Sequence, residues 1–461
     1  MKAIALLGPT AALAALLAVM PAAADAAAAG SSDLDALRGE VEELKRQVRL
    51  LQEQLAAVLA QTPQAPATPP PVAVAPPVVP APAPGASSAP APPTPGGTAG
   101  TRIPSLLNPA LSAVFQMIGN TSLVRESEAN GFDLSEAEIA LQSDVDPFTR
   151  VDLFVSLPAD ESPEIEEGFI TTVSLPGPLQ LRGGRFKSAF GKWNLLHNHA
   201  FFTVERPDVL GNVFGDESLT SDGLSLSVLI PNPWDLYIDA ITEIGTARPG
   251  ASFNSGGRHL TFVQRLTTFF NPGPNSTIET GLSAAFGKTG PGERLTGALD
   301  TLGLSGVLEP RDDLDARVYG LDVTWKWIPV GFNVYRSFLW QTEVLKSRLD
   351  IDRLDPIGMV LTPDRSASLG GYSYLEWQFA KRWRAGARYD VAGFPDSDTA
   401  RERSASGVVR FRPSEFQELR FQVKRTLRND EAAALFDGDG ADTRIFFEWI
   451  PAIGAHGAHK Y

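Results

Sequence analysis

Cysteine is absent from this chain, and so are a positive net charge and, beyond the first twenty residues, any long apolar run. With Cys 0 among 461 residues, the sequence excludes a disulfide framework, a lipid-bearing cysteine and a thiolate metal site. A formal net charge of −14 argues against nucleic acid as a partner, because binding to phosphates needs a basic surface. The lack of a second apolar stretch of about 18 residues excludes a helical membrane protein.

The N-terminus has the order of a secretory signal peptide. Lys2 precedes an apolar run at residues 3–20, which small residues follow. We therefore predict a signal peptide over residues 1–24 and export from the cytoplasm. An uncleaved membrane anchor is the alternative, but Gly8 and Pro9 interrupt an already short span.

Residues 32–61 are predicted to form a short α-helical coiled coil. Apolar residues recur there at spacings of three and four, with charged residues and Gln between them. A lone amphipathic helix packed on a domain is the alternative. Residues 62–104 are rich in Pro and Ala and predict an extended, semi-rigid linker. The coiled coil would then be a periplasmic stalk that holds protomers together or reaches peptidoglycan or another periplasmic partner.

Residues 105–461 show no helical period. Stretches of about ten residues recur instead, in which apolar and polar side chains alternate. In one of them Leu321 and Val323 share one face, and Asp322 and Thr324 share the other. A soluble β-sandwich alternates in the same way, so the connections must distinguish the two folds.

Every second predicted connection is a tight turn, and the intervening ones are mostly long. This two-sided pattern is typical of an outer-membrane barrel, with short turns in the periplasm and long loops outside. We therefore predict an all-β transmembrane antiparallel β-barrel of about 16 strands over residues 105–461. The longest connection would be the third external loop, which porins commonly fold into the lumen. The long connections are predicted at residues 188–220, 289–315, 347–367 and 428–441.

The stretch Leu181–Gly191, LRGGRFKSAFG, resembles a pattern of the phosphate-selective porin O and P family of outer-membrane channels. In layout the resemblance covers roughly residues 105–461. It implies a homotrimer whose lumen carries a ladder of basic residues that draws anions inward. The Gly183-Gly184 pair is expected to form a bulge that turns Arg185 and Lys187 inward. The candidate pore-lining residues are Arg150, Arg182, Arg185, Lys187, Arg384, Arg388, Arg410, Arg412, Arg420, Lys424 and Arg444.

Acidic residues share the predicted water-facing positions with these cations. A lumen wall that is merely polar is therefore the alternative to an anion-selective ladder. Acidic residues in the predicted external loops would also oppose the entry of anions. The offsetting acidic residues are Asp152, Asp322, Glu376, Asp390, Glu418 and Glu448.

Two histidine pairs and the acidic residues of the last long connection, at 429–442, are the candidates for a metal site, and the acidic connection lacks the spacing of an EF-hand. His197 and His199 form H-x-H in the third long connection, and His456 and His459 form H-x-x-H near the C-terminus. A structural or catalytic site normally needs three or four protein ligands, so we predict neither a metal nor a cofactor. The sequence contains no G-x-S-x-G, P-loop or paired-histidine helix motif, so we predict no enzyme.

The predicted function is that of a porin in the outer membrane of a Gram-negative bacterium. The porin would contact outer-membrane lipid and pass small hydrophilic solutes by diffusion, with anions such as phosphate favoured. One alternative is a metal or chelate uptake receptor without a plug, although such receptors have about 22 strands and a globular plug. The other is an envelope tether in which the barrel is only an anchor for the stalk.

Overall fold

The computed structural model describes Arg46 and residues 109–123, 130–159, 162–215, 218–234, 236–248, 250–254, 257–355, 357, 359–436 and 438–454. The chain divides into two units, residues 1–101 and 102–461. Apart from Arg46, every described residue belongs to the second unit. The predicted signal peptide, coiled coil and linker therefore lie outside the described residues, Arg46 excepted. In the part of the chain that is described, no helix is long and apolar enough to cross a membrane.

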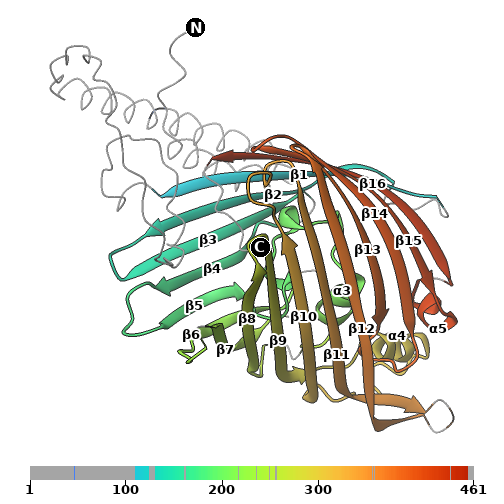
Figure 1. Cartoon of the computed structure of the whole chain (residues 1–461). Coiled ribbons are helices and arrows are strands. Elements are labelled where there is room, and N and C mark those ends of the chain that lie inside the picture. The colour runs from blue at the N-terminus through green and yellow to red at the C-terminus, as the bar shows by residue number, and fades with distance from the viewer. Residues whose placement is uncertain are drawn as a thin grey trace, which may run out of the picture. The chain divides into compact units, whose positions relative to one another are not determined.

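The second unit is a closed antiparallel β-barrel of sixteen strands, which confirms the predicted fold and strand number (Figure 1). Each strand pairs with its neighbours in sequence, and β1 pairs with β16 to close the ring. Closure removes the unpaired edges that an open sheet would have. The strands are β1 (Ala110–Ser122), β2 (Gly131–Asp144), β3 (Thr149–Pro158), β4 (Glu164–Thr172), β5 (Leu179–Lys187), β6 (Thr220–Leu229), β7 (Tyr237–Ala247), β8 (Thr261–Gly273), β9 (Ser276–Thr289), β10 (Leu314–Trp327), β11 (Ser337–Asp355), β12 (Val360–Ala380), β13 (Trp383–Gly393), β14 (Arg401–Ser414), β15 (Gln417–Arg428) and β16 (Ala441–Gly454).

The connections follow the predicted alternation in most places, but those after β3 and β11 are short, and the turn predicted at residues 328–330 extends over 328–336. Short turns follow most of the even-numbered strands, and most of the longer connections follow the odd-numbered ones. The long connection predicted at residues 347–367 is wrong, because β11 and β12 extend through almost all of it. Arg365 pairs with Asp350 at 3.0 Å and Arg353 pairs with Asp364, so cross-strand ion pairs continue the ladder here. Because charged residues stand here in place of apolar ones, the alternating pattern did not predict these parts of β11 and β12.

Side chains alternate between the outer and the inner surface of the barrel. Leu321, Leu375 and Phe421 point outward and are 49%, 45% and 49% exposed. Asp322 and Glu376, which directly follow the first two, are only 1% and 4% exposed because they point inward. An apolar outer surface around a polar interior is the arrangement of a barrel that meets lipid.

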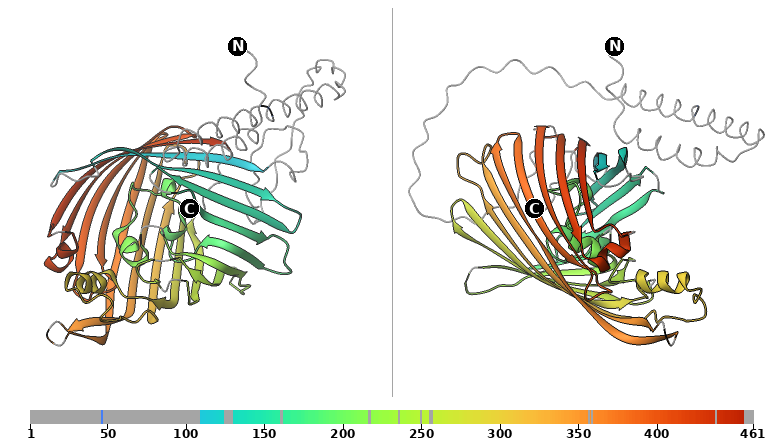
Figure 2. Two further views of the ribbon diagram at one scale, coloured as in Figure 1. Left: turned by 180° about the vertical axis from the view of Figure 1, so that it is seen from behind. Right: turned by 90° about the vertical axis from the view of Figure 1, so that its right-hand side faces the viewer.

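The connection between β5 and β6 folds into the barrel, and we call its residues 188–215 the lumen segment. It contains η3 (Trp193–Leu195), η4 (Asn198–Ala200) and α3 (Asp208–Phe214). Helix α3 lies within the ring of strands, against β12 and β13 (Figures 1 and 2). The remaining helices, α4 (Glu293–Thr301), α5 (Asp430–Ala433) and η5 (Ala434–Phe436), lie in long connections at one end of the barrel (Figure 2).

The main hydrophobic core lies inside the barrel, between the lumen segment and strands β8–β14. Trp193 is fully buried, and its ring centroid lies 5.4 Å from that of Phe201 and 5.5 Å from that of Tyr372. On β10, a Cβ atom at Gly320 would lie 2.8 Å from the Phe190 ring, so glycine makes room for that side chain. The core residues of the lumen segment are Phe190, Trp193, Leu196, Ala200, Phe201, Phe202, Val209, Leu210, Val213 and Phe214. The segment is therefore packed as tightly as the interior of a soluble protein.

Candidate solute pathway

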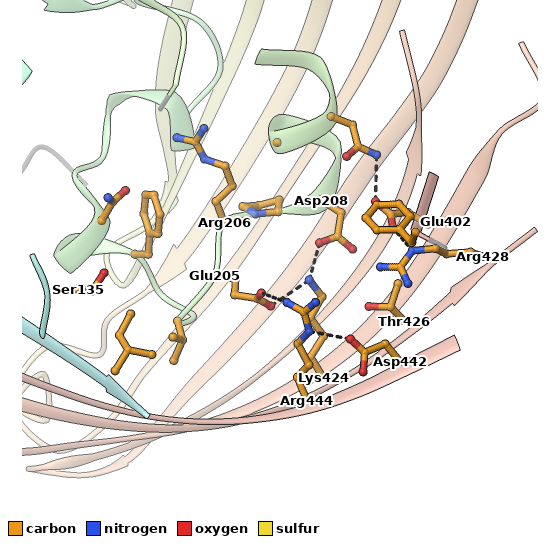
Figure 3. A pocket seen from close by; sticks show the side chains of 18 of the residues that line it. Ser135, Glu205, Arg206, Asp208, Glu402, Lys424, Thr426, Arg428, Asp442 and Arg444 are labelled. Atoms are coloured by element: carbon orange, nitrogen blue, oxygen red, sulfur yellow. Dashed lines mark hydrogen bonds and ion pairs between the residues drawn. The ribbon is translucent and has the colours of Figure 1, made fainter. Parts of the chain in front are cut away.

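A cavity of about 450 Å³ lies beside the lumen segment, inside the barrel (Figure 3). Strands β1, β2 and β14–β16 form one side of it, and residues 198–212 of the lumen segment form the other. A volume of this size falls within the range of sites for small molecules. Its charged lining has both signs: Arg206, Lys424, Arg428 and Arg444 are basic, and Glu205, Asp208, Glu402 and Asp442 are acidic.

Lys424 and Arg444 form the centre of the ion-pair network in this cavity (Figure 3). Lys424 Nζ lies 2.6 Å from Asp208 Oδ1 and 3.0 Å from Glu205 Oε2. Arg444 Nε lies 2.7 Å from Asp442 Oδ2. Burial by itself would raise the pKa of Asp208, but Lys424 and Arg388 outweigh burial and hold this pKa below its ordinary value. Asp208 at the start of α3 is therefore ionised at neutral pH and ties the helix to β15.

Deeper in the barrel, three arginines are almost completely enclosed. Arg388, Arg410 and Arg420 are at most 3% exposed, and their strand positions aim them inward. Each guanidinium donates to carboxylates on its own strand or on a strand one or two positions away, which is the condition under which a buried charge is tolerated. The contacts are Arg388 Nε to Asp390 at 2.8 Å, Arg410 Nη1 to Glu376 at 2.7 Å and Arg420 Nη1 to Glu448 at 2.9 Å.

In three inward-facing ion pairs the arginine is more exposed than the carboxylate, whereas in Lys424–Glu205 and Lys192–Glu279 the carboxylate is the more exposed partner. The exposed side-chain fractions are 42% and 16% for Arg444–Asp442, 41% and 9% for Arg412–Glu418, and 43% and 8% for Arg150–Asp152. Arg412 and Arg150 lie near short turns, whereas Arg444 lies near the start of β16, at the opposite end of the barrel. A solute entering from either end therefore meets guanidinium groups before it meets their partners.

The structure places the predicted pore-lining residues on the inner face of the barrel, except one. Arg182 faces inward with its guanidinium carbon 4.5 Å from the Phe169 ring centroid. Lys187 Nζ lies 2.5 Å from Glu166 and donates to the carbonyl oxygen of Leu196 at 3.0 Å. Lys187 is thus 2% exposed and holds the lumen segment, so it is not available to solute.

Arg185 is the exception, and its predicted inward orientation is wrong. Strand β5 pairs with β6 without a register shift, so the expected bulge at Gly183-Gly184 is not present in this strand pair. Arg185 lies opposite Asp222, with its Nε 2.7 Å from Asp222 Oδ1, on the same face as outward-pointing Leu224. Alternation therefore keeps Arg185 on the outer surface, whereas Lys187 at the end of β5 departs from it and contacts the lumen segment.

The conspicuous motif Leu181–Gly191 ends where the lumen segment attaches to the barrel wall. Glu343 Oε1 on β11 accepts hydrogen bonds from the backbone N–H groups of Lys192 at 2.9 Å and Trp193 at 2.8 Å. Gly191 has φ +59°, and a Cβ atom there would collide with the Glu343 carboxylate. Glycine is required at this position both by its backbone conformation and by the close approach of Glu343.

Several inward-facing charged residues were not singled out from the sequence. Arg265 on β8 lies 2.7 Å from Asp322, and the two side chains are 3% and 1% exposed. Glu279 on β9 lies 2.6 Å from Lys192 Nζ. The alternation of inward-facing and outward-facing residues along β8 and β9 could have identified Arg265 and Glu279 as inward-facing. The aromatic content of residues 189–214, unusual for an exposed loop, was the available signal for the internal core.

Comparison with known proteins gives one sequence relative and a group of structural neighbours. No family model matches the chain. An uncharacterized protein of Aquifex aeolicus (strain VF5) is 27% identical over 369 residues, which cover 73% of this chain and 71% of that protein. OprB of Pseudomonas putida superposes with a TM-score of 0.50 at 10% identity, covering 75% of this chain and 94% of OprB.

Two further solved structures are similar over the same share of the chain. The trimer form of OmpT of Vibrio cholerae has a TM-score of 0.48 at 9% identity, covering 75% of this chain and 99% of OmpT. The anion-selective porin from Comamonas acidovorans has a TM-score of 0.46 at 9% identity, with coverage of 75% and 99%. OprB and the Comamonas protein are outer-membrane porins with a 16-strand barrel. The likeness to OprB shows that this chain has the fold of such a barrel.

Proposed function

We propose that this chain is an outer-membrane porin that passes small hydrophilic solutes through the cavity beside the lumen segment. The observation that supports this most directly is the charged cavity of about 450 Å³ inside a closed barrel with an apolar outer surface. A polar passage through an apolar-coated barrel lets hydrophilic solutes cross a bilayer without covalent chemistry. We propose no catalytic activity.

We propose a weak preference for anions and no specificity for phosphate. The inward-facing candidates form a basic ladder on β13–β16, but acidic partners neutralise most of it in place. The preference follows from the unequal exposure of Arg444, Arg412 and Arg150 and their partners, which raises the local concentration of anions at both mouths.

The cellular setting is part of the same proposal. The apolar outer surface fits an outer membrane, and a homotrimer is the assembly that we propose there. Residues 32–61 would form the periplasmic stalk on the linker of residues 62–104, in contact with peptidoglycan or another periplasmic partner.

The test is single-channel conductance of the purified mature protein in planar lipid bilayers, with reversal potentials measured in a KCl gradient. We expect a stable open conductance and a reversal potential displaced modestly toward that of chloride. Added phosphate should change the current no more than its charge and mobility predict. A bilayer that stays closed would contradict passive diffusion.

A gated uptake channel is the second candidate, because the lumen segment is packed like a protein core and not like a mobile loop. In that case the wild-type bilayer would stay closed, and the Trp193→Ala variant, which loosens the segment, would conduct. A closed bilayer with both proteins would favour the envelope tether.

A further inference from the structure

A cluster of histidines and carboxylates lies between the lumen segment and strands β2 and β4, away from the ladder on β13–β16. His197 Nδ1 lies 2.9 Å from Glu138 Oε2 and 2.9 Å from Glu166 Oε2. His199 Nδ1 lies 3.4 Å from the same Glu138 oxygen. The donor atoms of Glu138, Glu166 and His197 all lie within 4.8 Å of one another. The cluster is thus a set of nitrogen and oxygen donors that converge on one point.

The cluster is buried and has an excess of negative charge. His197 and Glu138 are each 3% exposed, and Glu167 is 7% exposed. Glu138 Oε1 is also buried and has no hydrogen-bond partner among the described residues. The carboxylates of Glu138, Glu166 and Glu167 surround His197, and Lys187 reaches two of them, Glu166 through Nζ and Glu167 through its backbone N–H. Burying such a set without a further cation is costly.

Neighbouring groups orient the donors toward the convergence point. Lys187 occupies Glu166 Oε1 at 2.5 Å, which leaves Glu166 Oε2 facing His197. Glu167 Oε2 lies 3.0 Å from His197 Nε2, which leaves Nδ1 of this ring facing Glu138 and Glu166. A histidine that binds a metal through one nitrogen usually donates its other N–H to a carboxylate in this way. The ring also packs on Phe154, with 4.7 Å between centroids.

We propose that His197, Glu138 and Glu166 bind one divalent transition-metal ion of the zinc class through three protein ligands, which leaves a fourth position open. His197 Nδ1 lies 2.9 Å from each carboxylate oxygen, which compares with about 3.3 Å along the edge of a tetrahedron with metal bonds of about 2.05 Å, and all three donors lie within 4.8 Å of one another. Imidazole and carboxylate donors suit Zn²⁺ and its neighbours better than Ca²⁺ or Mg²⁺, which prefer oxygen alone.

A metal here would join three parts of the chain that are far apart in sequence. Glu138 belongs to β2, Glu166 to β4, and His197 to the lumen segment. The ion would therefore anchor the lumen segment to the wall opposite its hydrophobic core. The site does not depend on whether the cavity conducts solute, so it can fail or hold independently of the proposed porin function.

The experiment uses the full mature chain without a histidine tag, with His456→Ala and His459→Ala as background to remove the C-terminal pair. The metal-free protein is titrated with Co²⁺, whose visible absorption reports tetrahedral nitrogen and oxygen ligation. We expect one Co²⁺ per chain, displaced by one equivalent of Zn²⁺, and a thermal midpoint that falls on chelation.

Glu138→Gln is the main variant, because it keeps the shape of the side chain and removes a ligand charge. It should raise the dissociation constant for Co²⁺ by more than about 100-fold. Loss of a residue that only hydrogen-bonds to a metal ligand raises this constant by about 10-fold to 100-fold, so a larger change identifies Glu138 as a ligand. Glu136→Gln is the matched control, since it lies two residues away on the same face of β2 and should keep the binding. Absence of Co²⁺ binding in the background protein, or binding that survives Glu138→Gln, would overturn the proposal.

Discussion

The lumen segment meets two walls of the barrel by opposite means. On the basic wall, formed by β13–β16, side chains of the wall donate to the backbone of the segment: Arg388 donates to the carbonyl oxygen of Glu205 at 2.7 Å, and Arg420 to that of His199 at 2.7 Å. On the acidic wall, formed by β2–β4, carboxylates of the wall face the imidazole of His197. The segment thus offers main-chain oxygens and the carboxylates of Glu205 and Asp208 to the basic wall, and the imidazole of His197 to the acidic wall.

This difference determines which substitutions can release the segment. Backbone carbonyls are present whatever the residue, so the hydrogen bonds from Arg388 and Arg420 can be lost only by changing the wall. Attachment to the acidic wall depends on His197 itself, so a change within the segment is sufficient there. The two walls also place opposite charges across the lumen, which orients charged solutes.

The largest effect is expected from Trp193→Ala, which removes the apolar anchor of the lumen segment on β12. Trp193 is fully buried against Phe201, Phe202 and Tyr372. We expect a loss of about 3–5 kcal/mol of unfolding free energy. Because the segment would then leave its position, single-channel conductance should rise. Trp383→Ala, on the outer surface, is the control and should leave conductance unchanged; equal conductance of both variants would contradict the packing role.

Arg388→Met tests attachment to the basic wall. It removes a buried cation that binds Asp390 and two backbone carbonyls of the segment, and we expect a loss of about 3 kcal/mol in denaturant unfolding. The matched change Arg412→Met removes a guanidinium that is 41% exposed and should cost less than about 1 kcal/mol. Similar losses for the two variants would show that burial does not distinguish these sites.

The bond between Asp208 and Lys424 gives the basic wall a pH dependence. Since the pKa of Asp208 is lowered by folding, its contribution to stability is present above the unfolded value of about 3.9 and is lost as the pH falls through the folded pKa. The difference in thermal midpoint between wild type and Asp208→Asn should therefore be constant from pH 8 to pH 5 and shrink below about pH 4. If the difference in thermal midpoint shrinks near neutral pH instead, a group other than Asp208 causes the pH dependence.

Arg444→Gln tests the charge of the cavity and not its attachment. This guanidinium is 42% exposed, so its removal should lower the chloride-to-potassium permeability ratio by about twofold to tenfold, with little change in stability. The reversal potential in a KCl gradient measures the ratio. An unchanged reversal potential would mean that solutes do not pass this residue.

The smallest effect is expected from Arg185→Gln, which changes the same kind of residue on the outer surface. Its ion pair with Asp222 is partly exposed, so the loss of stability should stay below about 1 kcal/mol. Conductance and reversal potential should equal those of wild type. A shift in selectivity like that of Arg444→Gln would place Arg185 in the lumen after all.

The sequence predicted the barrel well because the residues of each strand are enough to show which of its faces is apolar. Alternation is a local property with period two, so Leu321 and Asp322 reveal the two faces without knowledge of the partner strand. Alternation did not predict the strand where the outward face is charged, as at Arg365 on β12. The prediction was also wrong where a Gly-Gly pair suggested a bulge that the strand pairing does not contain.

For the candidate site, the sequence predicted which residues face inward but not which residues contact one another. The alternation of side chains correctly placed Arg388, Arg420 and Lys424 on the inner face, but several of their partners lie on other strands or on the lumen segment. The contact between Arg420 and His199 joins residues 221 positions apart, and no local pattern records it. The same holds for His197, which looked like half of an incomplete pair until Glu138 and Glu166 were placed beside it.

By itself, the sequence determined that this chain forms an even-stranded barrel with an apolar outside, because alternation and turn spacing are local and repeat along the chain. Only the tertiary structure decided that residues 188–215 form a core within the lumen, that nearly every cation of the ladder has a carboxylate partner, and that the histidines meet an acidic wall. Those outcomes depend on how a long connection fills an enclosed space, where side chains distant in sequence must satisfy one another's charge and volume.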